Sequence, residues 1–112
     1  MDGGGDYKVV LFNAGDADAA SLRGVADELK GGETNAAFFV CSVREGRLSF
    51  VVSATKDIKA ADFSASETAK KIASFLGGNG GGRKDFAQGG GQAKEYSNDF
   101  KAKIIGIIRG KG

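Results

Sequence analysis

Apolar and polar residues follow periods that change along the chain from strand-like to helix-like. The first patterned segment, Tyr7–Phe12, is a short run of β-prone residues that ends before Gly15. Its apolar residues are consecutive over Val9–Phe12, which predicts a strand inside a sheet that is covered on both faces. Residues 1–6 hold three glycines and two aspartates, so we expect a disordered extension there and one globular domain over residues 7–110.

A helical period follows this strand. From Asp18 onward, apolar residues recur at spacings of three and four, which places them on one face of a helix. They are Leu22, Val25, Ala26 and Leu29. Asp16 or Asp18 can cap the N-terminus of this helix, and Gly31 and Gly32 end it.

Two β-rich runs come next, over Ala36–Arg44 and Arg47–Thr55, and Glu45-Gly46 between them predicts a tight hairpin turn. In the second run, larger apolar residues alternate with mostly small or polar ones. The first set is Leu48, Phe50 and Val52, and the second is Ser49, Val51 and Ser53. One face of this hairpin is therefore expected to be more polar.

After an irregular link over Lys56–Phe63, a second helical pattern begins with a capping box from Ser64 to Glu67. Gly77 or Gly78 is expected to end this helix in the left-handed conformation. Its apolar face consists of Ala69, Ile72, Ala73 and Leu76.

The last part of the chain predicts a short edge strand over Phe86–Gln88 and a third amphipathic helix over Glu95–Arg109. The apolar face of this helix consists of Phe100, Ile104, Ile107 and Ile108. The order of elements predicts an α/β fold, a single small domain with a mixed β-sheet of about four strands flanked by three helices.

Length and composition argue against several classes of protein and of site. The 112 residues are enough for one domain, and no apolar run approaches the roughly 20 residues of a membrane helix, so no membrane partner is expected. Histidine is absent, which argues against zinc sites and catalytic triads, and no cofactor is expected. Cys41 is the single cysteine and lies in an apolar run, which favours a buried thiol in a reducing compartment such as the cytoplasm.

Charge is uneven along the chain. Residues 1–55 carry five basic and eight acidic groups, whereas residues 56–112 carry eleven basic and six acidic groups. The basic half also holds the most unusual stretch, Leu76–Gly91, in which eight of sixteen residues are glycine. This asymmetry suggests that one side of the domain faces a polyanion.

The glycine-rich stretch has two interpretations. Its bare N–H groups can cradle a phosphate, with Arg83 and Lys84 adding positive charge. Alternatively, the glycines end a helix, turn the chain and let a strand pack closely against its neighbour. The polar residues Arg83, Asp85 and Gln88 stand at fixed offsets inside the stretch, which favours a binding role over that of an inert linker.

These residues carry a family resemblance. Residues 77–91 read Gly-Gly-Asn-Gly-Gly-Gly-Arg-Lys-Asp-Phe-Ala-Gln-Gly-Gly-Gly. The run resembles the signature of the C-terminal C-Ala domain of alanyl-tRNA synthetase, a DHHA1-type domain, roughly Gly-Gly-x-Gly-Gly-Gly-Arg-Pro-Asp-x-Ala-Gln-x-Gly-Gly. Every position matches except the proline, where this chain has Lys84. The order of upstream elements is also similar, so the resemblance spans nearly the whole chain.

The resemblance implies a non-catalytic domain that binds tRNA, namely tRNA-Ala at its elbow, and supports aminoacylation and editing of alanyl-tRNA. The implied partners are this tRNA and the other domains of alanyl-tRNA synthetase, with the chain itself a monomer and its parent an alanine–tRNA ligase. The residues expected to contact nucleic acid are Gly80, Gly81, Gly82, Arg83, Lys84, Gln88, Lys56, Lys59, Lys70 and Lys71. Asp85 is expected to have a structural role, either holding Arg83 or capping N–H groups of the turn, because a carboxylate aimed at a phosphate would repel it.

Two alternatives stay open. A DHHA1 domain in a DHH phosphoesterase grips the terminal phosphate of a small nucleotide, although the catalytic Asp-His-His set of those enzymes is absent from this chain. A divergent C-Ala module could instead bind duplex DNA or a protein partner.

Overall fold

The computed structural model describes residues 7–58 and 63–109. The expected extension over residues 1–6 and the predicted contact residue Lys59 lie outside these ranges. In chain order, the elements are β1 (Lys8–Asn13), α1 (Ala19–Gly31), β2 (Ala36–Arg44), β3 (Arg47–Ala54), α2 (Ala65–Leu76), β4 (Asn79–Gly82), β5 (Phe86–Gln92) and α3 (Asn98–Ile108).

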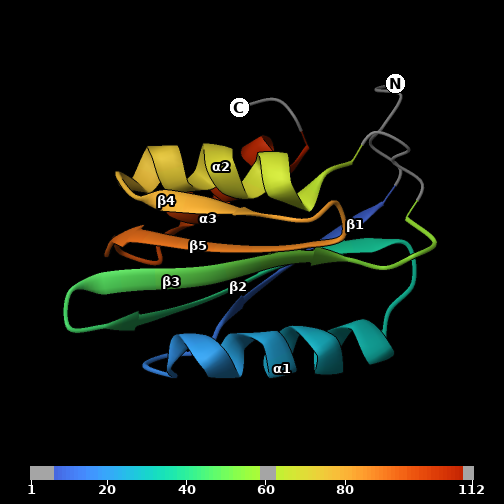
Figure 1. The fold of residues 1–112 in the computed structure, drawn as a ribbon, viewed down its shortest axis with the longest axis horizontal. Helices are drawn as coiled ribbons and strands as arrows, with labels where there is room; N and C mark the ends of the chain where they lie inside the picture. Colours follow the sequence, from blue (N-terminus) through green and yellow to red (C-terminus); the bar gives the residue numbers. More distant parts are fainter. Residues whose placement is uncertain (1–6, 59–62, 110–112) are drawn as a thin grey trace.

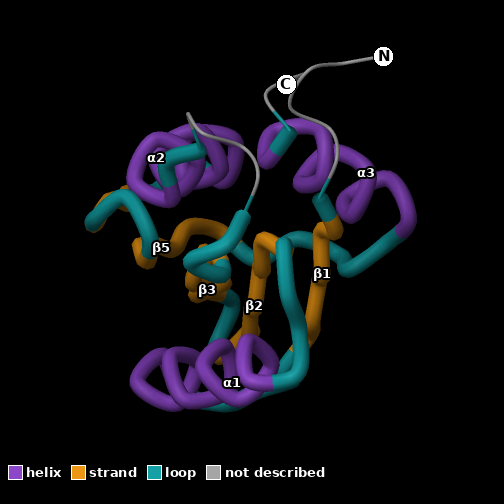
Figure 2. The backbone as a smooth tube through the Cα atoms, turned by 90° about the vertical axis from the view of Figure 1, so that its right-hand side faces the viewer, coloured by secondary structure: helices purple, strands orange, loops and turns teal. Residues whose placement is uncertain are grey.

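The strands form one five-stranded sheet in the order β1-β2-β3-β5-β4. β1 runs parallel to β2, and the other neighbouring pairs are antiparallel. Figures 1 and 2 show α1 on one face of the sheet and α2 and α3 on the other. The predicted α/β fold with a mixed sheet and three helices is thus confirmed, with β4 as a strand beyond the expected four.

Two strand positions differ from the predictions. The segment expected as an edge strand over Phe86–Gln88 extends to Gln92 and lies inside the sheet, because the glycine run of β4 pairs along its outer side. β1 was expected inside the sheet but forms its other edge, where it pairs with β2 alone among the described strands. Accordingly, the side chain of Phe12 is 42% exposed.

The main core lies between the sheet and the pair α2 and α3. Phe39 is fully buried at its centre, with its ring 5.5 Å from that of Phe50 and 6.2 Å from that of Phe100. A smaller cluster lies under α1 and is formed by Leu22, Ala26, Val40 and Val51. The face of the β2–β3 hairpin toward α1 is more polar, as predicted, yet Ser53 is buried and its hydroxyl donates to the Asp85 carbonyl at 3.4 Å.

Most predicted boundaries are confirmed by capping contacts. Asp18 caps α1, and hydrogen bonds from the Ser21 hydroxyl and N–H lower the pKa of its carboxyl group. The Ser64 hydroxyl accepts the Glu67 N–H at 3.2 Å, and Gly77 ends α2 with φ of 72°. α3 begins at Asn98, later than the predicted Glu95, because Ser97 provides its N-cap.

The two ends of the described chain are bonded to each other. The Tyr7 hydroxyl donates to the Ile108 carbonyl at 3.3 Å, and the Arg109 guanidinium donates to the Tyr7 carbonyl at 3.2 Å. These contacts join the residue before β1 to the end of α3. These two hydrogen bonds supplement the apolar packing that holds α3 against the sheet.

Because the Cys41 thiol is buried, we expect the free energy of unfolding to fall at high pH. Burial raises its pKa from 9.0 to about 11, so the unfolded chain ionises this thiol first. The resulting stabilisation is complete below pH 9 and is lost as the pH rises from 9 toward 11, by at most about 1.4 kcal/mol per pH unit. Urea unfolding of the wild type and of Cys41→Ala between pH 8 and 10.5 measures this difference. Parallel stability curves for the two proteins would contradict it.

Candidate nucleic-acid interface

The glycine-rich stretch folds as the hairpin of β4 and β5 and not as a loop. The Arg83 N–H donates to the Phe86 carbonyl at 2.8 Å, which makes these two residues a hydrogen-bonded pair. Bonded and non-bonded pairs alternate in an antiparallel ladder, so Gly81 is bonded to β5 while Gly80 and Gly82 are not. The N–H groups of Gly80 and Gly82 therefore point away from β5, toward the open edge of the sheet.

The same glycines allow α2 to lie directly on the hairpin. A β-carbon on Gly80 would stand 2.9 Å from the Ala69 carbonyl oxygen, and one on Gly91 would stand 2.5 Å from the β-carbon of Leu76. Real side chains do not approach that closely, so these positions require glycine for packing. The close-packing interpretation is thus correct at Gly80 and Gly91, and it is compatible with a binding role for the opposite face.

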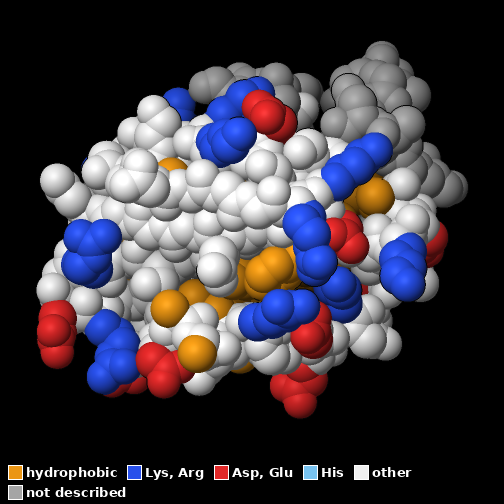
Figure 3. All heavy atoms as spheres, in the orientation of Figure 1, with side chains coloured by type: hydrophobic (Ala, Val, Ile, Leu, Met, Phe, Trp, Pro, Cys, Tyr) orange, Lys and Arg blue, Asp and Glu red, His pale blue; other side chains and the backbone are white. Residues whose placement is uncertain are grey.

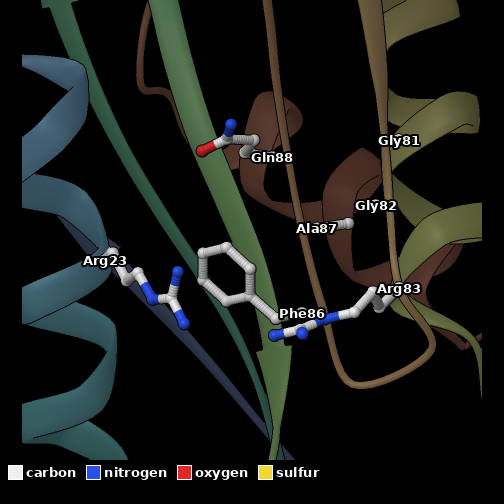
Figure 4. A pocket seen from close by; sticks show the side chains of 7 residues that line it. All are labelled: Arg23, Gly81, Gly82, Arg83, Phe86, Ala87 and Gln88. Carbon is white, nitrogen blue, oxygen red and sulfur yellow. The ribbon is translucent and has the colours of Figure 1, made fainter.

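On the α1 side, the sheet is only partly covered. α1 packs against β2 and β3 and has no comparable packing against β5 or β4 among the described residues. Figure 3 shows apolar side chains exposed above α1, next to Lys and Arg side chains and a broad area without apolar or charged side chains. A cavity of about 270 Å³ opens there, shown in Figure 4. It is lined by Arg23, Gly81, Gly82, Arg83, Phe86, Ala87 and Gln88.

Arg83 stands in this cavity with Asp85 near it, as expected. The Arg83 Nε lies 4.0 Å from the Asp85 Oδ1, and the two side chains are 72% and 67% exposed. An ion pair this long and this solvated contributes little stability. Asp85 therefore orients the guanidinium loosely, and Arg83 can still bind an anion in the cavity.

Lys84 lies on the other side of the hairpin turn. Its carbonyl accepts the Ala65 N–H at 2.8 Å, which fastens the turn to the first residue of α2. Its side chain lines a cavity of about 340 Å³ together with that of Lys56. The structure thus brings these two predicted contact residues together, apart from the cavity that holds Arg83.

The two predicted contact lysines of α2 lie in different places. The Lys70 side chain passes over β4, with its Cε 3.9 Å from where a β-carbon of Gly81 would be. Its ammonium also lies 3.9 Å from a carboxylate oxygen of Glu67. Lys71 is exposed about 100° further round the helix. Of the described contact residues, Gly81, Gly82, Arg83 and Gln88 therefore share one cavity, and Lys71 belongs to neither of the two cavities.

Sequence reasoning missed Arg23. Its guanidinium carbon lies 4.8 Å from the centre of the Phe86 ring, which is half-buried against the α1 cluster. Arg23 comes from α1, more than 50 positions before the glycine-rich stretch, and belongs to no local motif. Only the pairing of β3 with β5, which sets Phe86 beside α1, reveals it.

Residues 7–58 and 63–109 contain neither a helix that could span a membrane nor a cluster of side chains that could hold a metal ion. None of the helices in these ranges has the length and apolarity needed to cross a membrane. Nor do three or more acidic or cysteine side chains in these ranges gather in a way that could hold a metal ion.

Comparison with protein-family models gives a match to the DHHA1 domain over residues 6–110. Alanine–tRNA ligase of Natranaerobius thermophilus is 32% identical over 104 residues, covering 93% of this chain and 12% of that protein. The ligases of Endomicrobium trichonymphae and Thermotoga maritima are 40% and 36% identical over 73% and 82% of this chain. The chain spans about a tenth of the length of these relatives, 9% and 10% in the last two.

Among solved structures, the fold matches the C-Ala domain from Aquifex aeolicus alanyl-tRNA synthetase. The TM-score is 0.80 with 27% sequence identity, and the match covers 99% of this chain and 97% of that domain. The similarity in fold therefore extends over nearly the whole of both chains.

Proposed function

Because the chain belongs to the DHHA1 family, we propose that it is a non-catalytic C-Ala module that binds tRNA through the glycine hairpin and its open face. The observation that carries this proposal is the half-covered sheet, where Arg83, Gln88 and bare glycine backbone share one cavity. Folded RNA is recognised mainly through phosphate, 2′-hydroxyl and stacking contacts. Backbone amides, guanidinium groups and side-chain amides supply the donors that such contacts need.

Several cations extend this surface. Lys70 lies over β4, and Lys84 and Lys56 line the cavity on the other side of the turn. The outward N–H groups of Gly80 and Gly82 lie along the edge between these positions. A phosphate backbone that followed this edge would meet positive charge on both sides of the hairpin.

The proposed ligand is tRNA-Ala, bound at its elbow, and the proposed parent is an alanine–tRNA ligase whose aminoacylation and editing domains act on the same tRNA. The similarity to alanine–tRNA ligases of several bacteria supports this assignment. In such a protein, this module would act as a monomer within the longer chain and in the cytoplasm. Its contribution would be affinity and placement of the tRNA and not chemistry.

Neutralising Arg83 and Lys84 together, as Arg83→Gln and Lys84→Gln, should weaken tRNA binding by about tenfold or more. Two phosphate contacts are lost, so the slope of log affinity against log salt should become shallower by about two. Titration of tRNA-Ala at several salt concentrations measures both quantities. Arg44→Gln with Arg47→Gln is the matched control, since it removes two exposed charges at the far hairpin turn.

The same titration with an unrelated tRNA and with duplex DNA tests the ligand class. An elbow-binding module should bind both tRNAs more tightly than DNA, because the elbow is common to folded tRNAs. If the Arg83 and Lys84 variant stays folded and binds tRNA as the wild type does, the hairpin is not the contact surface. Equal binding of all three nucleic acids would contradict elbow recognition and indicate general attraction to polyanions.

A further inference from the structure

We infer that the groove between α1 and the glycine hairpin holds one unpaired nucleotide of an RNA loop, with Arg23 as a binding residue. This inference rests on the proposed RNA-binding function. It adds α1 and Arg23 to the binding surface and specifies a single nucleotide as the ligand. Its basis is a pair of adjoining cavities along β5 that share Gln88. One has the chemistry of a phosphate site, and the other has that of a base site.

The phosphate end lies at Phe86. In Figure 4, Arg23 reaches its ring from α1 and Arg83 approaches from the hairpin, so the two guanidinium groups face one cavity from opposite sides. The Phe86 ring supports the Arg23 guanidinium at 4.8 Å and restricts its motion. Within the described residues, no carboxylate lies within 4.0 Å of the Arg23 guanidinium. Its donors are therefore available for a planar, bidentate contact to phosphate.

The base end lies three to four residues further along β5, at Gly89 and Gly90. There a cavity of about 500 Å³ is hollowed because Gly89 and Gly90 carry no side chains. Its walls are largely apolar and come from Ala19 and Ala20 of α1 and from Phe50 and Val51 of β3. A flat, uncharged base fits such walls better than a second phosphate does.

Gln88 connects the two cavities. Its exposed side chain has one carbonyl acceptor and an amide donor, the combination that can bond the edge of a base. Phe86, Gln88 and Gly90 point to the same face and are spaced by about 7 Å along the strand. The single step from Phe86 to Gln88, where the two cavities meet, matches the reach from the phosphate to the base within one nucleotide. A base that is paired inside a duplex cannot enter the groove, so the nucleotide bound there must be unpaired.

Two substitutions test the two ends separately. Arg23→Ala removes the phosphate contact, and Ala20→Leu fills the base cavity from the surface of α1 while keeping a good helix former. The controls are Arg47→Ala, at the far end of β3, and Ala102→Leu, exposed on α3. The probes are tRNA-Ala, an RNA hairpin with an unpaired loop, and a blunt RNA duplex with the same number of phosphates. Guanosine monophosphate and inorganic phosphate serve as competitors.

Arg23→Ala and Ala20→Leu should each weaken binding of the loop RNA by about tenfold, as expected for the loss of a base or phosphate contact. Binding of the blunt duplex should change by no more than the controls do. The nucleotide should displace the loop RNA at concentrations where inorganic phosphate does not. Thermal unfolding confirms that each variant is folded.

The outcomes separate this inference from the proposed function. If the wild type binds tRNA and responds to the Arg83 and Lys84 change, but Arg23→Ala and Ala20→Leu behave as their controls, the nucleotide groove is wrong and the proposed function stands. Equal loss of loop and duplex binding in Arg23→Ala makes Arg23 a general phosphate contact and also overturns the groove. If the wild type binds none of the RNA probes, both proposals fail.

Discussion

Gly78→Ala should destabilise the fold by about 3 kcal/mol or more, because it forces backbone against backbone. A β-carbon at this position would lie 1.9 Å from the Gly90 carbonyl oxygen and 2.6 Å from the Gly91 α-carbon. Neither atom belongs to a side chain that could rotate away, so β4 and β5 would have to separate. Gly78 also donates its N–H to the Ala73 carbonyl at 2.8 Å, which ties the same residue to α2. Urea unfolding followed by circular dichroism measures the loss.

Gly24→Ala is the matched control, since nothing lies within 4 Å of a β-carbon built there. It is an exposed position inside α1, where alanine should stabilise the protein by up to about 1 kcal/mol. The two changes are chemically identical and should have opposite signs. If Gly78→Ala unfolds at the same urea concentration as the wild type, then the backbone of Gly78 does not lie as close to β5 as described.

Phe39→Ala should cost about 3 to 5 kcal/mol, a large fraction of the total stability of a small domain. Its side chain is fully buried and its ring contacts those of Phe50 and Phe100 from β3 and α3. Truncation leaves a cavity at the point where the sheet and α3 meet, and it removes two aromatic contacts. Differential scanning calorimetry and urea unfolding should both report the loss.

Phe12→Ala provides the comparison for Phe39→Ala, because Phe12 is 42% exposed on the edge strand β1. Removing it should cost less than about 1.5 kcal/mol, since much of its surface already meets water. Phe39→Leu should fall between the two, because leucine fills most of the cavity. Equal losses for Phe39→Ala and Phe12→Ala would show that the stacked rings are not the centre of the core.

The elements that the sequence predicted well are those whose side chains carry a periodic pattern. The face of α3 that holds Phe100 and Ile104 is buried, and the predicted hairpin turn forms at Glu45-Gly46, with positive φ at both residues. Caps at Asp18 and Ser64 also match, because a capping side chain bonds only a few residues away. Local chemistry is sufficient to specify each of these features.

The pattern could not predict β4. Asn79–Gly82 has no side chain after the asparagine, so neither alternation nor β propensity marks it as a strand. It becomes one because α2 and β5 leave room only for bare backbone at Gly78 and Gly80. Because β4 pairs with the outer side of β5, β5 is an interior strand. The failure to predict β4 therefore also explains why Phe86–Gln88 was wrongly predicted as an edge strand.

The candidate site was predictable only in part, for a similar reason. Arg83 and Gln88 stand inside a motif that can be read in one segment, and the structure brings them into one cavity. Arg23 reaches the same cavity from α1 through the order of strands in the sheet, which no local spacing encodes. Lys56 and Lys84, grouped with Arg83 as one footprint in the sequence, line a separate cavity beyond the turn.

The bonds between Tyr7 and the residues Ile108 and Arg109 have a consequence for attachment. Tyr7 precedes β1, and three strands separate β1 from β4 at the opposite border of the sheet. Any polypeptide joined to either end would therefore depart from a single corner, remote from the groove. A domain attached in this way can turn its open face toward a large ligand, and the attached polypeptide would not cross the groove.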